Sequence, residues 1–253
     1  EASFGVGSEA VVALTQLPEV DVVVNALVGA AGLEASYTTL KAGKVLALAN
    51  KESLVVGGEY VMRLAAEKRA PILPIDSEHS AIFQCLVGER APVRRLIVTC
   101  SGGAFRDLRR EELAGVTVEQ ALRHPQWEMG AKITIDSSTL VNKGFEVIEA
   151  HWLFGTPVEK ITVLLHPQSI VHSMVEFKDG AVMAQLGAPD MRIPISLALT
   201  YPERKQTPAP ALDLLSCPPL TFAEIDEDTF DCFRLAKQAA KRGGTGCAAM
   251  NAA

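Results

Sequence analysis

Hydrophobic residues in the first third of the chain alternate between two spacings. Continuous apolar runs at residues 21–27, 44–49 and 71–74 have the length of buried strands. The segments 30–42 and 52–69, which separate these runs, carry apolar residues at helical spacing. Strands that alternate with helices in this way predict a parallel sheet whose crossover connections are right-handed.

The middle of the chain predicts a mixed α/β region. Residues 94–99 and 160–166 are expected to form strands, and the runs 171–177 and 181–186 flank an Asp-Gly pair that is typical of a hairpin turn. Between them, the segment 133–152 is predicted to open as a short apolar strand, to turn at Asp-Ser-Ser and to continue as a helix.

The last fifty residues change character again. Residues 201–227 are rich in proline and have little periodicity, which predicts a linker, whereas residues 228–242 resume a helical pattern. These changes divide the chain into two α/β units, a linker and the start of a helical region, with the bounds 1–75, 76–200, 201–227 and 228–253.

Composition excludes several classes of protein. The chain has 253 residues, of which 48% are hydrophobic, and a net charge of −6 without a basic patch, so neither nucleic acid nor a membrane is an expected partner. No apolar run reaches the length of a transmembrane helix. The five cysteines lack a C-x-x-C pair, which favours reduced thiols in a cytoplasmic compartment.

Two carboxylates follow the third apolar run directly. Asp76 and Glu78 leave the carboxyl end of the predicted strand with Ser77 between them, and that edge is where open α/β sheets bind ligands. Carboxylate oxygens at such a position suit Mg²⁺ or Mn²⁺. The alternative is a helix start, because Asp and Ser cap free backbone N–H groups and Glu suits the first turn.

A second polar group lies in the segment 133–152. Ser137, Asn142 and Lys143 supply the hydroxyl, amide and ammonium groups that hold a phosphate. Glu146 lies three residues after Lys143, so both belong to one helix face, and Glu146 could complete a metal site. The alternative is a solvent-exposed ion pair of little energetic weight.

Two glycine-rich segments are candidates for nucleotide contacts. Residues 5–10 fit the pattern G-x-G-x-x-A, but only four residues precede them, so an ordinary loop entering a helix is favoured over a pyrophosphate loop. Gly29 and Gly32 follow a predicted strand; either a bound cofactor or close packing of the strand against the next helix explains them.

Seven segments in order resemble the 1-deoxy-D-xylulose 5-phosphate reductoisomerase family, and the resemblance extends from about Val20 to Ala253. The segments are ANKES (49–53), IDSEHSAIFQ (75–84), SGGAFR (101–106), RHPQWEMG (123–130), DSSTLVNKGFEVIEAHWLF (136–154), HPQSIVHSM (166–174) and QLGAPDMRIPI (185–195). Two departures stand out: Cys100 replaces an expected glycine, and the nucleotide fingerprint and most of the C-terminal helical domain of the family are missing, as in a fragment.

The resemblance implies roles for individual residues. It implies that three carboxylates hold the divalent metal, namely Asp76, Glu78 and Glu146. It implies contacts to the sugar phosphate from Lys51, Ser77, Ser101, His124, Ser137, Asn142, Lys143 and Glu146, with Lys51 and the three carboxylates also catalytic. It implies contacts to NADPH from Asn50, Glu52 and Gly130, and a lid that contains Trp127 and Met129. His172 matches a histidine near the family's active site.

The resemblance also implies the fold and the reaction. We expect a partial Rossmann-like NADPH-binding domain, an α/β catalytic domain that forms a homodimer, and the start of an all-helical C-terminal domain. The family rearranges a ketose phosphate with the help of Mg²⁺, Mn²⁺ or Co²⁺ and then reduces the product with NADPH, in the bacterial cytoplasm or in plastids. A nicotinamide-free, metal-dependent isomerase or aldolase and an inactive sugar-phosphate sensor are the alternatives. As a fragment, the chain is expected to reduce little by itself.

Overall fold

The structure of the chain is a computed structural model that describes residues 4–253. Its first sheet contains β1 (Val22–Asn25), β2 (Val45–Leu48) and β3 (Ile72–Pro74), which are parallel and lie in the order β1-β2-β3. The central strand β2 is buried on both faces, since Leu46, Ala47 and Leu48 have no exposed surface. The predicted parallel sheet is therefore confirmed.

Helices connect and cover this sheet, as the helical spacing predicted. They are α1 (Ser8–Thr15), the short 3₁₀ turn η1 (Gly29–Ala31), α2 (Gly32–Lys41) and α3 (Glu52–Lys68). Helix α1 follows residues 4–7 without an intervening strand, so the segment 5–10 has the geometry of a loop entering a helix. At Gly32, an added Cβ would lie 2.4 Å from the side chain of Asn50. Gly32 therefore allows close packing at this position, which is one of the two explanations given for it above.

The second sheet is mixed and has the order β7-β6-β4-β5-β8. Its strands are β4 (Val93–Cys100), β5 (Ile161–Leu165), β6 (Val171–Phe177), β7 (Val182–Leu186) and β8 (Ala223–Glu224). Strands β4 and β5 are parallel, and β6 and β7 form the predicted hairpin. The hairpin turn places Gly180 at a φ of 91°, and the Asp179 carboxylate accepts a hydrogen bond from the backbone of Ala181.

The prediction of a strand at Ile133 and Ile135 is wrong, because these residues lie in helix α6 (Ala131–Ser138). Two alternating isoleucines are too short a pattern to distinguish a strand from a helix. Within the helix, Thr134 donates a hydrogen bond to the Gly130 carbonyl, and Ser138 donates to the Ile135 carbonyl. The predicted turn is displaced to Thr139 and Leu140, where the φ of Leu140 is 57°. Leu140 is a buried core residue, and this burial offsets the strain of its left-handed backbone.

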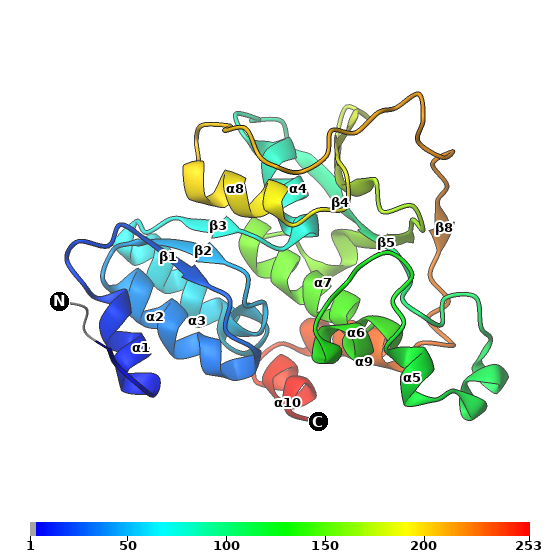
Figure 1. Ribbon diagram of the computed structural model, residues 1–253, viewed down its shortest axis with the longest axis horizontal. Helices are drawn as coiled ribbons and strands as arrows, with labels where there is room; N and C mark the ends of the chain where they lie inside the picture. The colour runs from blue at the N-terminus through cyan, green and yellow to red at the C-terminus, as the bar shows by residue number, and fades with distance from the viewer. Residues whose placement is uncertain (1–3) are drawn as a thin grey trace.

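Helix α7 (Val141–Phe154) lies between the two sheets (Figure 1). It packs against α3 on one side and against α9 (Asp231–Arg242) on the other. Both contacts depend on glycine, because an added Cβ on Gly58 of α3 would lie 2.2 Å from the Trp152 ring, and one on Gly144 of α7 would lie 2.4 Å from the Cβ of Ala236. The helix is therefore held at short distance from both neighbours.

The remaining elements surround this framework. Helix α4 begins shortly after β3, and in Figure 1 α8 lies beside α4 and above β3. Between α8 and α9 the chain crosses the surface with little regular structure apart from β8. The bounds of the other elements are α4 (Ser77–Leu86), η2 (Arg110–Gly115), α5 (Val118–Ala121), η3 (Val158–Lys160), α8 (Arg192–Thr200) and α10 (Gly246–Ala252).

The contact at Gly144 generates a first prediction. We expect Gly144→Val to lower the free energy of unfolding by about 2 kcal/mol or more, because its Cβ would collide with Ala236 in a packed core. Chemical denaturation of the two proteins measures the difference. The control is Gly115→Val, since a Cβ at Gly115 meets no atom within 4 Å and should change the stability by less than about 0.5 kcal/mol. Equal losses in the two variants would contradict the packing argument.

Candidate active site

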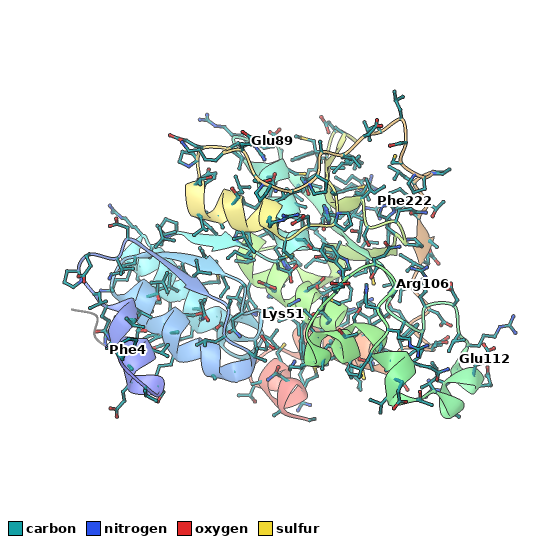
Figure 2. All side chains as sticks on the ribbon, viewed as in Figure 1. Phe4, Lys51, Glu89, Arg106, Glu112 and Phe222 are labelled. Atoms are coloured by element: carbon teal, nitrogen blue, oxygen red, sulfur yellow. The ribbon has the colours of Figure 1, made fainter. Side chains whose placement is uncertain are left out.

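One cavity of about 300 Å³ collects most of the polar residues that the sequence indicated. It opens at the carboxyl ends of β2, β3 and β4, and α6 and α7 supply its other walls. Lys51, which is labelled in Figure 2, marks its place between the two halves of the molecule. The predicted site residues that line this cavity are Lys51, Asp76, Ser77, Glu78, Ser101, His124, Trp127, Met129, Ser137, Asn142, Lys143 and Glu146.

The three carboxylates converge from two helices. Asp76 is the N-cap of α4, Glu78 lies in its first turn, and Glu146 lies in the middle of α7. One oxygen from each lies within 4.8 Å of the others. Asp76 Oδ1 accepts the backbone N–H of Glu78 at 3.2 Å, whereas Oδ2 lies 2.6 Å from Lys51 Nζ. Capping and ligand binding are therefore compatible, because each uses a different oxygen of Asp76.

Two buried ammonium groups neutralise these carboxylates. Lys51 Nζ lies 2.6 Å from Asp76 Oδ2 and 3.1 Å from Glu146 Oε1. Lys143 Nζ lies 2.7 Å from Glu78 Oε1 and also contacts Glu146 Oε2. Lys143 and Glu146 are only 4% and 2% exposed, so the alternative of a solvent-exposed pair is wrong. These contacts are strong because water does not screen them.

The pKa values follow from burial and from this pairing. Burial, together with the charge of Glu146, raises the pKa of Glu78 to about 7. Burial opposes the charged form of Asp76, but the ammonium of Lys51 and the ring of His79 hold the pKa of that carboxyl well below its usual value. Burial alone would lower the pKa of Lys51, but Asp76 and Glu146 raise it well above 10.5. Lys51 and Asp76 are therefore both charged near neutral pH.

The donor set fits a hard divalent cation. All three carboxylates present oxygen atoms, which Mg²⁺ and Mn²⁺ prefer. Glu146 Oε2 is buried and accepts no hydrogen bond of good geometry from residues 4–253, although Lys143 lies against it. A cation bound by these oxygens would neutralise the carboxylate charge that the ammonium groups of Lys51 and Lys143 balance in this structure.

Ser101 and His124, two candidate phosphate contacts, also line the cavity. The backbone N–H groups of Gln126 and Trp127 donate to His124 Nδ1 at 3.1 and 2.9 Å, so the ring proton resides on Nε2 and is donated to Ser101 Oγ at 3.1 Å. Burial and the charge of Arg106 lower the pKa of His124, in keeping with a neutral ring. Arg106 in turn donates to the Ser101 carbonyl oxygen at 3.0 Å.

A glycine brings this loop against α6. Gly103 has a φ of 68°, and a Cβ there would lie 2.4 Å from the carbonyl oxygen of Ser137. The Ser101 loop and Ser137 are thereby placed at one end of the cavity. Asn142 lies differently, because its amide donates to Glu146 Oε1 at 2.6 Å and its oxygen accepts from Lys51 at 2.7 Å. In this structure Asn142 and Lys143 contact the carboxylates.

Three predicted cofactor contacts lie outside the cavity lining. Asn50 is buried, and its amide donates to the carbonyl oxygens of Leu27 and Gly29 at 2.7 and 2.9 Å. It also lies 3.1 Å from Glu52 Oε2. Asn50 thereby ties the carboxyl end of β2 to the segment that follows β1. Gly130 is exposed and precedes α6 as its N-cap. The place of Asn50 and Glu52 at the sheet edge is compatible with a cofactor beside the cavity.

The segment predicted to form a lid contributes to the cavity lining through Trp127 and Met129. Trp127 is half-buried, and its ring centroid lies 6.4 Å from that of His172, which also lines the cavity. Cys100, the departure from the family pattern, is buried and accepts the backbone N–H of Gly102 at 3.2 Å. Burial raises the pKa of its thiol to about 11, so the group is an uncharged acceptor that supports the turn.

Sequence reasoning missed two charged residues behind the carboxylates. His79 and Glu149 have no exposed surface, and His79 Nδ1 lies 3.3 Å from both Asp76 Oδ1 and Glu149 Oε2. The spacing could have revealed them, because His79 follows Asp76 by three residues and Glu149 follows Glu146 by three. Ser169 and Met191 also line the cavity, and no pattern in the sequence pointed to either.

Comparisons with known proteins agree with the resemblance stated above. Models of 1-deoxy-D-xylulose 5-phosphate reductoisomerase match residues 1–58, and models of its C-terminal domain match residues 72–154 and 186–253. The enzyme of that name from Chlorobium chlorochromatii is 59% identical over all of this chain and 66% of its own length. The Bacillus subtilis enzyme is 54% identical over all of this chain and 67% of its own length.

Solved structures show the same likeness. A crystal structure of DOX-P reductoisomerase in complex with NADPH, fosmidomycin and magnesium has a TM-score of 0.92 and 44% identity over 97% of this chain and 63% of that one. The Zymomonas mobilis enzyme in complex with NADPH has a TM-score of 0.89 at 44% identity, over 97% of this chain and 64% of that one. The chain spans about two thirds of the length of its relatives. It belongs to the 1-deoxy-D-xylulose 5-phosphate reductoisomerase family.

Proposed function

We propose that the chain carries the metal and substrate site of an NADPH-dependent reductoisomerase. Its reaction converts 1-deoxy-D-xylulose 5-phosphate to 2-C-methyl-D-erythritol 4-phosphate, a step of non-mevalonate isoprenoid biosynthesis. The observation that carries the proposal is the convergence of three carboxylates, two buried lysines and three of the predicted serines on one cavity in a member of this family. A nicotinamide-free isomerase would use the same carboxylates but would not reduce its product.

Asp76, Glu78 and Glu146 would hold Mg²⁺, Mn²⁺ or Co²⁺. When bound, the cation supplies positive charge for the vicinal oxygens of the substrate during the rearrangement. Lys51 would act catalytically beside it, because its ammonium lies next to Asp76 and Glu146 and can donate to an oxygen that gains negative charge. Ser77, between two of the ligands, would contact the same part of the substrate.

The other end of the cavity would hold the phosphate. Ser101, Ser137 and the neutral His124 offer hydrogen bonds, and Lys143 and Asn142 lie within the same cavity. The phosphate does not react, so its binding energy is available to orient the substrate. Trp127 and Met129 would form the lid that excludes water from the aldehyde before hydride transfer.

The cofactor and the assembly are further parts of the proposal. NADPH would contact Asn50, Glu52 and Gly130 at the sheet edge, and two of the relatives were crystallised with NADPH. A homodimer would form along the second sheet, where Val182 and Met183 of the edge strand β7 are 51% and 44% exposed. Within residues 4–253 no helix is long and apolar enough to cross a membrane. Because the relatives named above are bacterial, we place the protein in the bacterial cytoplasm.

The deciding experiment follows NADPH absorbance with the complete protein. We expect oxidation after addition of 1-deoxy-D-xylulose 5-phosphate and Mg²⁺, and none after addition of a chelator. The 253-residue chain, assayed beside it, should oxidise little NADPH. Metal-dependent consumption of the sugar phosphate without NADPH oxidation would favour the nicotinamide-free isomerase, and consumption by neither route would favour the sensor.

Replacing a ligand carboxylate tests the metal site directly. We expect Glu78→Gln in the complete protein to lower kcat by about 10³-fold, because the amide removes an anionic ligand and its share of the charge that stabilises the reaction. Steady-state assays at saturating NADPH measure the loss. The control is Glu176→Gln on β6, a buried carboxylate paired with Arg94 and Arg95 away from the cavity, whose variant should keep its rate. Equal rates for wild type and Glu78→Gln would exclude the proposed role.

The raised pKa of Glu78 predicts how metal binding depends on pH. Protons compete with the cation for this carboxylate, so affinity should be lost as the pH falls through about 7 and should be constant above it. With one proton displaced, the loss is about tenfold per pH unit. Titrations of the chain with Mn²⁺ at several pH values measure it. Glu78→Gln should bind more weakly and lose most of this dependence; a dependence unchanged in the variant would assign it to another group.

A further inference from the structure

A buried ionic pair lies directly behind the proposed metal ligands. His79 of α4 and Glu149 of α7 each follow a ligand by one helical turn, and both side chains are completely buried. Neither lines the cavity. Their side chains therefore act on the site only through the residues in front of them.

His79 bridges the two helices that carry the ligands. Its Nε2 lies 2.8 Å from the carbonyl oxygen of Glu146, which can only accept, so this nitrogen donates. Its Nδ1 faces Asp76 Oδ1 and Glu149 Oε2, each at 3.3 Å. The ring also stacks on Phe154, with an interplanar angle of 16°. One imidazole thereby touches two of the three ligand residues, from α4 and from α7.

Glu149 has no comparable partner apart from His79. Within residues 4–253, neither carboxylate oxygen of Glu149 accepts a well-aligned hydrogen bond. In the same residues, His79 is the one cationic side chain within 4 Å of the Glu149 carboxylate. Burying a carboxylate with so little compensation is costly, and replacing a buried ion pair by apolar side chains of similar volume is often neutral or stabilising. Stability alone therefore does not account for a charge at this position.

We infer that Glu149 is a positioning residue that fixes the orientation of His79, and through it the Asp76 carboxylate and the α7 backbone at Glu146. The inference rests on the proposed metal site and deepens it. Groups that contact metal ligands orient them, and loss of such a group typically lowers metal affinity by about 10- to 100-fold. His79 is such a group here, and Glu149 acts on the ligands through it. Glu149 itself touches neither the cavity nor a reacting atom.

A metal ion between Asp76, His79 and Glu149 is the competing explanation, because atoms of these residues also lie within 4.8 Å of one another. Two features favour positioning. His79 and Glu149 are completely buried and do not line the cavity, whereas a bound Mg²⁺ usually keeps several waters. Asp76 Oδ1, the oxygen that faces His79, already accepts the backbone N–H of Glu78.

The test measures Mn²⁺ binding by the 253-residue chain, with free Mn²⁺ followed by electron paramagnetic resonance. We expect one Mn²⁺ per chain in the wild type and an affinity about 10- to 100-fold lower in Glu149→Gln. Glu176→Gln neutralises a buried carboxylate remote from the site and should bind as the wild type does. Unchanged affinity in a folded Glu149→Gln variant, or two Mn²⁺ per wild-type chain, would overturn the inference. Absence of any binding by the wild type would instead reject the proposed metal site.

Two further measurements separate positioning from a general loss of structure. In a His79→Asn background, Glu149→Gln should lower the Mn²⁺ affinity no further, because its effect passes through His79; additive losses would contradict this route.

In the complete protein, saturating Mn²⁺ should restore the kcat of Glu149→Gln, since the residue touches no substrate, and a kcat that stays low would refute a role confined to positioning. If circular dichroism shows that Glu149→Gln does not fold, Glu149→Asp takes its place in the binding test. Its shorter side chain withdraws the carboxylate by one methylene, so its Mn²⁺ affinity should also be lower than that of the wild type.

Discussion

The close packing of α7 between two sheets is the constraint on which the site depends. Gly58 and Gly144 allow the neighbouring helices to approach α7 so closely that its polar residues are removed from water. Charges in such a place interact strongly, but each unpaired one is costly. The carboxylates of α4 and α7 are consequently stable only together with the ammonium groups of Lys51 and Lys143. Packing and electrostatics therefore cannot be separated here.

Much of the fold followed from the sequence because its strands are short, apolar and separated by helices. The sheet of β1, β2 and β3 and the β6–β7 hairpin belong to this group. The strand expected at Ile133 and Ile135 failed for a physical reason. Two alternating isoleucines suggest a strand, but so short an apolar run does not distinguish a strand from a helix by periodicity.

The candidate site also contains some parts that the sequence could predict and others that it could not. Residues in one local segment, such as Asp76 and Glu78, could be predicted to act together because a strand end places them side by side. That Lys51 reaches Glu146, ninety-five positions away, depends on how α3 packs against α7, and no local pattern contains that information. His79 and Glu149 had the correct spacing, but only burial distinguishes such a pair from ordinary residues on a helix surface.

Both lysines pair with the ligand carboxylates. In the proposed function, this pairing links metal binding to phosphate binding. The ammonium of Lys143 has three hydrogens, and two of them face the carboxylates of Glu78 and Glu146. These two hydrogens cannot also bind a phosphate. A divalent cation bound by the carboxylates would repel the ammonium of Lys143 and leave it available to an anionic phosphate in the same cavity. Metal and sugar phosphate should therefore bind cooperatively, because each relieves the charge imbalance that the other creates.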